Sequence, residues 1–154
     1  MANTYTQTYI QFVFAVQNRK SLILPDWEHH LYKYITGIIQ NKRNKMIAIN
    51  GMPDHLHMFI GFHTTDSMAG LIQVVKSESS KWITDRGFTD SKFKWQEGFG
   101  AFSYSRSQIN RVYHYVMNQK QHHKKKTFRE EYVHMLEKFG VEYDERYIFK
   151  TVEY

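Results

Sequence analysis

Apolar residues follow two different spacings along this chain, and the changes between them mark the expected strands and helices. Residues 5–16 contain the run "YIQFVFAV", in which the large apolar residues Ile10, Phe12, Phe14 and Val16 stand at alternate positions; this predicts a strand at or near the centre of a sheet. Residues 26–39, directly after Pro25, repeat apolar positions three and four residues apart and predict a helix.

The middle of the chain predicts a hairpin, followed by a second helix and a further strand. "KMIAIN" is typical of a strand, "GMPD" of a turn, and "HLHMFIG" of the antiparallel partner strand. Gly87 predicts the end of the second helix, and Ser107 is placed to cap a third helix. The expected elements are strands at 45–50, 55–61 and 99–105, and helices at 67–82 and 107–122.

This order of strand, helix, strand, strand, helix, strand predicts an α+β fold. Two helical crossovers over an antiparallel sheet give the ferredoxin-like, or RRM-like, arrangement, with the helices on one face and the third helix appended. The chain has 154 residues, of which 42% are apolar, and contains no internal repeat or linker. We therefore expect one domain over residues 1–154.

Composition narrows the possible chemistry of a functional site. The chain has no cysteine, which excludes disulfides and thiolate metal sites, so any metal must be held by nitrogen and oxygen atoms. Nine histidines are present. No apolar run is long enough to span a bilayer, and no basic segment precedes one as in a secretion signal, so we expect a cytoplasmic protein.

Positive charge is concentrated in one part of the chain. The net charge is +6, and between Gly98 and Arg129 there are seven Lys or Arg residues and no carboxylate. This distribution favours a basic face for nucleic acid. An ordinary solvated surface of mixed charge is the alternative interpretation.

The strand 55–61 carries two histidines on one face. Because side chains alternate along a strand, His55 and His57 share a face, while Leu56, Met58 and Ile60 share the other face and are expected in the core. We expect the histidine face to lie on the open side of the sheet, where two imidazoles can converge on one ion. Taken alone, the short pattern is more typical of two half-exposed histidines with no ligand role than of a metal site.

The third predicted helix has a polar face as well as an apolar one. At 3.6 residues per turn, Tyr115 and Gln119 lie one turn apart, so a phenol and a carboxamide are neighbours. The same layout places Tyr113 in the core. A tyrosine of this kind is more often a packing residue than a nucleophile, since its pKa near 10 requires help before it attacks. The polar face holds Arg111, Tyr115, Gln119 and His122, and the apolar side holds Ile109, Val112, Tyr113, Val116 and Met117.

Taken together, these segments resemble the single-tyrosine HUH transposases of bacterial and archaeal insertion sequences and their repeat-associated relatives. The resemblance rests on "PDHLHMFIG", "WQEGFGAFSYSRSQ", "VYHYVMNQKQHH" and "TFREEY", and extends to "FVFAVQNRK" and "LIQVVKSESSKWI". It implies that His55, His57 and Gln119 are metal ligands and that Tyr115 is the nucleophile. The implied cofactor is a divalent ion, Mg²⁺ or Mn²⁺.

The resemblance also implies an activity and its partners. The enzyme would bind hairpin-containing single-stranded DNA at element ends, cleave it through a 5′-phosphotyrosine bond and rejoin the strands without a nucleotide cofactor; the sequence has no P-loop. A homodimer with shared active sites is implied. The residues whose charge suits contacts with DNA phosphates are Arg19, Lys20, Lys76, Lys81, Arg106, Arg111, Lys120, Lys124, Lys125 and Lys126.

Two alternatives come from other functional classes. One is an RRM-like nucleic-acid-binding module without catalysis. The other is a metal-dependent phosphodiesterase that uses activated water, in which Tyr115 has only a structural role. A covalent adduct between protein and DNA distinguishes the transposase from both.

Overall fold

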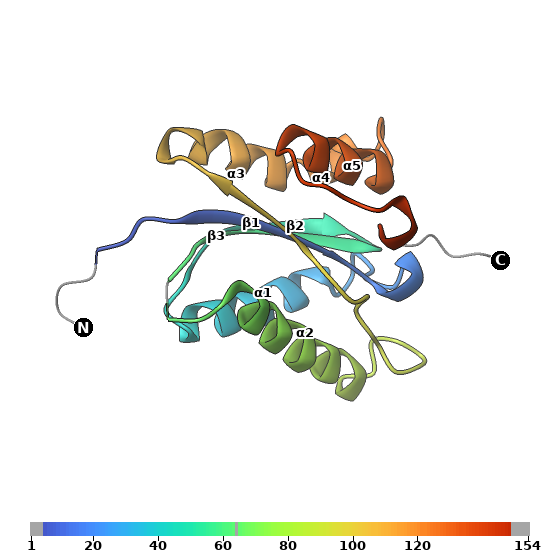
Figure 1. Ribbon diagram of the computed structural model, residues 1–154. Helices are drawn as coiled ribbons and strands as arrows, with labels where there is room; N and C mark the ends of the chain where they lie inside the picture. Colours follow the sequence, from blue (N-terminus) through green and yellow to red (C-terminus); the bar gives the residue numbers. More distant parts are fainter. Residues whose placement is uncertain (1–4, 64, 149–154) are drawn as a thin grey trace.

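Four antiparallel strands form one sheet that lies between two layers of helices (Figure 1). The computed structural model describes residues 5–63 and 65–148. The strands are β1 (Tyr9–Ala15), β2 (Lys45–Met52), β3 (His55–Gly61) and β4 (Gly100–Tyr104). The helices are α1 (Glu28–Asn41), α2 (Met68–Asp85), α3 (Ile109–Met117), α4 (Gln119–His122) and α5 (Phe128–Lys138).

The sheet confirms the predicted ferredoxin-like arrangement. Its strand order is β2-β3-β1-β4, so β1 is central, as its alternating pattern predicts. The crossover helices α1 and α2 cover one face together (Figure 1). Ser67 caps α2 through its hydroxyl, and Gly87 follows the end of that helix with a φ of 71°, a conformation that favours glycine. Among the described residues, no helix has both the length and the apolar composition needed to cross a membrane.

The face covered by α1 and α2 contains the largest apolar core. Phe12 and Phe14 of β1 are fully buried there, together with Leu56, Met58 and Ile60 of β3. This confirms the prediction that these three β3 residues belong to the core. These strand residues pack against α1, which precedes the hairpin in the chain, and α2, which follows it. This packing explains why amphipathic helices occur in the sequence on both sides of the hairpin.

The opposite face of the sheet is covered by α3, α4 and α5 (Figure 1). The prediction that the histidines lie on an open face is therefore wrong: the side chains of His55 and His57 are fully buried. The physical reason is that Val13 and Phe102 also point to this side and pack against Phe128 of α5. Apolar residues on both sides of the sheet require cover on both sides.

The helix predicted at 107–122 is divided in two. Ser105, and not Ser107, caps its start, in a capping box with Gln108, and the chain departs from helical geometry at Asn118. The side-chain amide of Asn50 on β2 donates a hydrogen bond of 3.0 Å to the carbonyl of Met117, which satisfies an acceptor at this break. The break separates Tyr115, on α3, from the start of α4.

Tyr113 is not a core residue. Its side chain is 39% exposed, whereas Val112 and Val116 carry the contacts of α3 with the sheet. The buried face of α3 is narrower than the apolar face predicted from the sequence. The reason is that one short helix rests on the sheet here and, of its residues, only Val112 and Val116 are buried. Tyr113 and Met117 lie at its edge and remain partly in solvent.

Candidate active site

Two backbone features place His55 and His57 at the end of the hairpin. Strand β3 pairs with β2 on one side and with β1 on the other, which holds the backbone of both histidines. A Cβ atom at Gly51 would lie 2.2 Å from the carbonyl oxygen of His55, so only glycine allows the two strands to approach this closely. The β2–β3 hairpin therefore brings the histidines under α4 and α5.

Nitrogen and oxygen atoms of four side chains converge at this point. The Nε2 atom of His55 lies 3.3 Å from Gln119 Oε1, and the Nε2 atom of His57 lies 3.1 Å from Glu131 Oε1. Both Gln119 and Glu131 are buried. The donor atoms of His55, His57 and Glu131 lie within 4.8 Å of one another, a spacing that can hold a metal ion.

The other ring nitrogens of the two histidines have partners that set their orientation. His55 Nδ1 lies 2.7 Å from Asp54 Oδ1, and His57 Nδ1 lies 2.7 Å from Gln11 Oε1. Both acceptors favour a proton on Nδ1, which leaves the lone pair of Nε2 directed at the centre of the cluster. Arg19 in turn holds Asp54 at 3.1 Å. This arrangement is typical of imidazoles that ligate a metal.

Electrostatics keep these groups in the protonation states that a ligand set needs. Burial lowers the pKa of His55 to about 4, so its imidazole is neutral at physiological pH. Burial acts to raise the pKa of Asp54, but hydrogen bonds from His55 and Arg19, together with the positive charge of Arg19, hold that pKa below its ordinary value. The pKa of Glu131 is also lowered: His57 and hydrogen bonds from His123 and Tyr115 outweigh the effect of its burial.

Tyr115 reaches the same cluster from α3. Its hydroxyl donates a hydrogen bond to Glu131 Oε2, and its ring lies 5.9 Å from the ring of His57. Burial, and then the charge of Glu131, raises the pKa of the phenol above its ordinary value. All of these groups belong to one chain. The structure thus brings together the four site residues expected from the sequence, Tyr115, His55, His57 and Gln119.

Two members of this cluster were missed by the sequence analysis. Glu131 lies on α5, and the His123 Nε2 atom is 3.1 Å from Gln119 Oε1 and 3.3 Å from Glu131 Oε1. Glutamate is rarely buried, so a buried glutamate in a structure indicates a functional role. The sequence alone does not show which glutamate is buried. The segment between Gly98 and Arg129, which contains α3 and α4, has no carboxylate, and Glu131 reaches Tyr115 from the later helix α5.

An ion pair of Lys120, the residue after Gln119, crosses the end of the sheet. Lys120 Nζ lies 3.0 Å from the buried carboxylate of Glu28 at the start of α1, and it donates a 2.6 Å hydrogen bond to the carbonyl of Gly51. This pair ties α4 to the hairpin turn and to the opposite layer of helices. Lys120 therefore has a structural role that the predicted DNA contact did not include.

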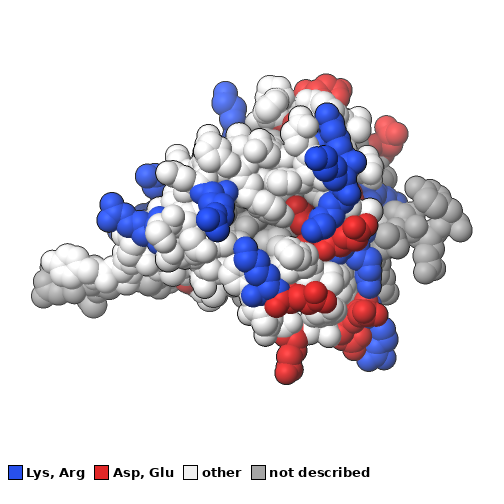
Figure 2. Space-filling model, turned by 90° about the horizontal axis from the view of Figure 1, so that it is seen from above, with Lys and Arg blue, Asp and Glu red and all other residues white. Residues whose placement is uncertain are grey.

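The other basic residues divide between paired and unpaired groups. In the part of the chain that the structure describes, Arg19 pairs with Asp54 and Lys81 pairs with Asp85, whereas Lys124, Lys125 and Lys126 form no ion pair. Seen from the side of α3 to α5, the Lys and Arg side chains form separate groups rather than one continuous stripe (Figure 2). The exposed residues Lys20, Arg106 and Arg111 also lack an ion pair within the described ranges.

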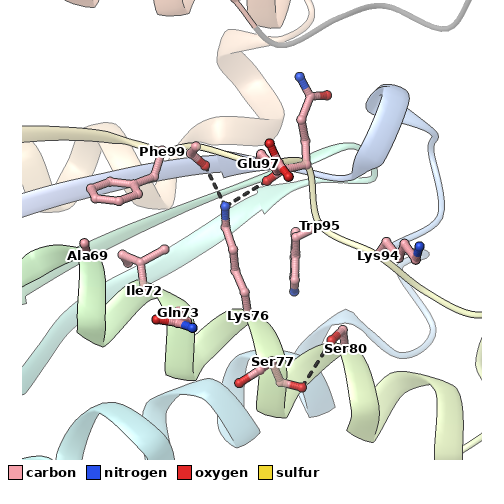
Figure 3. Close-up of a pocket in the computed structure, with 12 residues that line it drawn as sticks. Ala69, Ile72, Gln73, Lys76, Ser77, Ser80, Lys94, Trp95, Glu97 and Phe99 are labelled. Carbon is pink, nitrogen blue, oxygen red and sulfur yellow. Dashed lines mark hydrogen bonds between the residues drawn. The ribbon is translucent and has the colours of Figure 1, made fainter.

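Lys76 and Lys81 lie on α2, in the layer on the other side of the sheet from Tyr115 (Figure 1). The amino group of Lys76 donates hydrogen bonds to the carbonyls of Gln96 and Gly98, at 2.8 and 2.6 Å, in a pocket that Trp95 and Phe99 also line (Figure 3). Burial lowers the pKa of Lys76 to about 8. Lys76 and Lys81 therefore lie on the opposite face of the sheet from Tyr115, the nucleophile expected from the sequence.

Comparisons with known proteins agree with the fold. Among curated proteins, no sequence matches the chain. One similar solved structure is a transposase candidate from Deinococcus radiodurans R1, with a TM-score of 0.62, 14% identity, and coverage of 77% of this chain and 95% of that chain. Another is a REP-associated tyrosine transposase bound to a REP hairpin, with a TM-score of 0.60, 15% identity, and coverage of 80% and 73%.

The family itself is shown by the sequence. A family model described as "Transposase IS200 like" matches residues 4–119, which include β1 to β4, both histidines, Tyr115 and Gln119. Glu131 and His123 lie beyond the matched range. The match covers most of the chain, the fold is similar to that of the two solved structures, and the residues that carry the resemblance meet in one buried cluster. This chain therefore belongs to the IS200-like transposase family.

Proposed function

We propose that this protein cleaves and rejoins single-stranded DNA through a covalent bond between Tyr115 and a 5′-phosphate. The observation that carries the proposal is the meeting of the Tyr115 hydroxyl with His57 and Glu131 in one buried cluster. An isolated surface tyrosine would have no such neighbours. A tyrosine with only a packing role would not require that the Nε2 atoms of His55 and His57 point to Glu131, the residue that accepts its hydrogen bond.

The residues of the cluster fit a divalent metal ion. Their donor set has imidazole nitrogens from His55 and His57, an amide oxygen from Gln119 and a carboxylate oxygen from Glu131. When bound, the ion would polarise the scissile phosphate and offset the charge that develops in the transition state. The donor set suits Mn²⁺ by softness, and Mg²⁺ is compatible with the two oxygen ligands.

The two carboxylate oxygens of Glu131 face different partners. Oε1 lies toward His57, while Oε2 accepts from the Tyr115 hydroxyl and, at 3.1 Å, from the side-chain amide of Gln119. Glu131 therefore holds the phenol in place and can accept its proton through Oε2. A bond forms between the Tyr115 oxygen and phosphorus, and the bond from phosphorus to the 3′-oxygen breaks. The 3′-oxygen receives, through water, the proton that Tyr115 gave to Glu131, so that a free 3′-hydroxyl is left and Glu131 is again a carboxylate.

The reaction is reversible because the phosphotyrosine bond conserves the energy of the phosphodiester. A 3′-hydroxyl that attacks the phosphotyrosine restores a DNA strand and returns the proton to Tyr115. The hairpin bound in the related tyrosine transposase supports hairpin-containing single strands as the substrate. A homodimer is implied by the resemblance, whereas the placement of Tyr115 beside the histidines of its own chain supports a site that one chain completes.

Trapping of the covalent adduct tests this function. The protein is incubated with Mn²⁺ and a pool of labelled oligonucleotides, each with a hairpin and randomised flanking bases, and resolved under denaturing conditions. We expect a labelled protein band whose label lies on the 3′ side of the break, together with a free 3′-hydroxyl fragment. Binding without cleavage would instead indicate an RRM-like module, and cleavage without an adduct would indicate a phosphodiesterase that uses water.

A further inference from the structure

A hollow of about 530 Å³ opens beside the Tyr115 ring, between the end of α4 and the start of α5. Its volume is in the range of sites that take a small ligand or part of a polymer. The proposed reaction accounts for Tyr115 and Glu131 but for none of the other side chains here. The lining residues are Tyr115, Gln121, His122, Lys124, Lys125, Lys126, Glu131 and His134.

His122 has an unused polar atom in this position. Its ring lies 4.7 Å from the ring of Tyr115, at an angle of 35°. Its Nε2 atom is buried and has no hydrogen-bond partner within the described part of the chain. A buried polar atom without a partner is uncommon and calls for a ligand or a functional explanation. Because the His122 ring lies beside Tyr115, a group that binds to His122 Nε2 would lie close to the reacting phosphate.

The charge of the hollow favours an anion. Three consecutive lysines, Lys124 to Lys126, line it and form no ion pair among the described residues, while its single carboxylate, Glu131, already contacts His57 and Tyr115. The turn that carries the lysines is held at its base, because the backbone N–H groups of Lys125 and Lys126 both donate to the carbonyl of His122. Lysine ammonium groups grouped in this way suit successive phosphates of a strand.

We propose that this hollow receives the DNA backbone during the reaction, and that His122 is a further catalytic residue. His122 Nε2–H donates a hydrogen bond to a non-bridging oxygen of the phosphate that Tyr115 attacks, and the three lysines contact the neighbouring phosphates. This inference rests on the proposed function. The histidine keeps its proton throughout, while the bond from the Tyr115 oxygen to phosphorus forms and the bond from phosphorus to the 3′-oxygen breaks.

Replacement of a non-bridging oxygen of the scissile phosphate by sulfur tests the proposed hydrogen bond from His122. A purely structural role of His122 would not give the result expected here. Single-turnover cleavage is measured with the normal oligonucleotide and with each of the two phosphorothioate diastereomers. We expect His122→Ala to slow cleavage of the normal strand about 100-fold, as removal of one donor to a developing charge does in other enzymes. The variant should also lose the discrimination against one diastereomer, while His30→Ala, on the exposed surface of α1, behaves as the parent.

Unchanged rates in His122→Ala, or equal sensitivity of parent and variant to both diastereomers, would overturn the inference. Thermal unfolding of the variant shows whether a slow rate comes from loss of the fold. His122→Gln, which retains an N–H donor, should recover part of the rate.

A second measurement does not depend on cleavage. In the Tyr115→Phe background with ¹⁵N-labelled histidine, the ring nitrogens of His122 are followed by NMR while a thymidine dinucleotide with one phosphodiester is added. We expect the His122 Nε2 signal to shift and that of His30 to stay. No shift at His122 would overturn the inference, whereas failure of the parent to form an adduct would contradict the proposed function alone.

Discussion

The Tyr115 hydroxyl donates its hydrogen bond to the carboxylate of Glu131, although the imidazole of His57 lies directly beside it. The two residues are sixteen positions apart and belong to different helices, α3 and α5. Since burial and the nearby carboxylate both raise the pKa of the phenol, Tyr115 remains protonated and held in place until a substrate arrives. This relationship makes Glu131 the link between the nucleophile and the metal ligands.

Replacement of Tyr115 by Phe removes the reacting oxygen and little else. We expect Tyr115→Phe to abolish adduct formation, to leave hairpin binding nearly unchanged and to alter the free energy of unfolding by about 1 kcal/mol, because one hydrogen bond is lost. Tyr113→Phe is the matched control, since Tyr113 is partly exposed on the same helix. An adduct of normal yield with Tyr115→Phe would show that another group attacks.

Glu131 and its neighbour Glu130 provide a matched pair for metal binding. Glu130 is exposed and accepts from Thr127, whereas Glu131 is buried in the cluster. Calorimetric titration should show that Glu131→Gln weakens Mn²⁺ binding at least about 10-fold, and that Glu130→Gln does not. His55→Ala and His57→Ala should each weaken binding and abolish cleavage. Equal Mn²⁺ affinity in the parent and the double histidine variant would remove the ligand role from both imidazoles.

The lysines of α4 and the following turn should differ in their contribution to DNA binding. Each phosphate contact adds about −0.7 to the slope of log affinity against log salt for a single strand. Replacement of Lys124, Lys125 and Lys126 by Ala should therefore make that slope shallower by about 2. Lys120→Ala should leave the slope unchanged, because this lysine pairs with Glu28, and should instead lower the thermal stability.

A slope that changes as much in Lys120→Ala as in the triple variant would contradict this division. It would show that Lys120 leaves Glu28 to contact DNA.

Lys76 should titrate far below its ordinary pKa. Burial lowers that pKa to about 8, whereas the exposed Lys81 has a raised pKa because of its hydrogen bond with Asp85 (Figure 3 shows Lys76). ¹³C NMR of the methylated protein should give a midpoint near 8 for Lys76 and a higher midpoint for Lys81. Assignment uses Lys76→Arg and Lys81→Arg.

The sign of the associated change in stability follows from the same shift. Below about pH 8 the lysine is protonated in the folded and the unfolded chain. Between about pH 8 and the unfolded value of 10.5, the unfolded chain binds more protons, so the contribution of Lys76 to the free energy of unfolding rises with pH. A Lys76 midpoint above 10 would mean that the amino group is solvated.

Mixed dimers test whether each site belongs to one chain. One subunit lacks both site histidines through His55→Ala and His57→Ala but keeps Tyr115, and the other carries Tyr115→Phe. Since Tyr115 contacts the cluster of its own chain, we expect no adduct from the mixture. Co-purification through two different tags verifies that heterodimers form. An adduct found only on the histidine-deficient chain would support the shared site that the family resemblance implies.

The alternating and helical patterns were enough to predict the sheet and its order. "YIQFVFAV" marks the central strand and Gly87 the end of α2, because each depends on local geometry or on simple partition of apolar residues. The turn predicted over "GMPD" is shorter in the structure: Gly51 and Met52 still pair in β2, and only Pro53 and Asp54 form the turn. The His55-x-His57 spacing and the Tyr115 to Gln119 spacing are likewise local. They identified the residues that the fold later brings together.

Only the tertiary structure decided what covers the histidine face and which residues complete the cluster. Glu131 and His123 reach His57 and Gln119 because α3 ends at Met117 and the chain returns through α5 over the sheet. A sequence pattern does not show that the chain changes direction here. It also does not show that Glu131 is buried, and a buried carboxylate is costly unless it has partners. The same packing exposes Tyr113, ties Lys120 to Glu28 and leaves His122 Nε2 beside Tyr115 without a partner among the described residues.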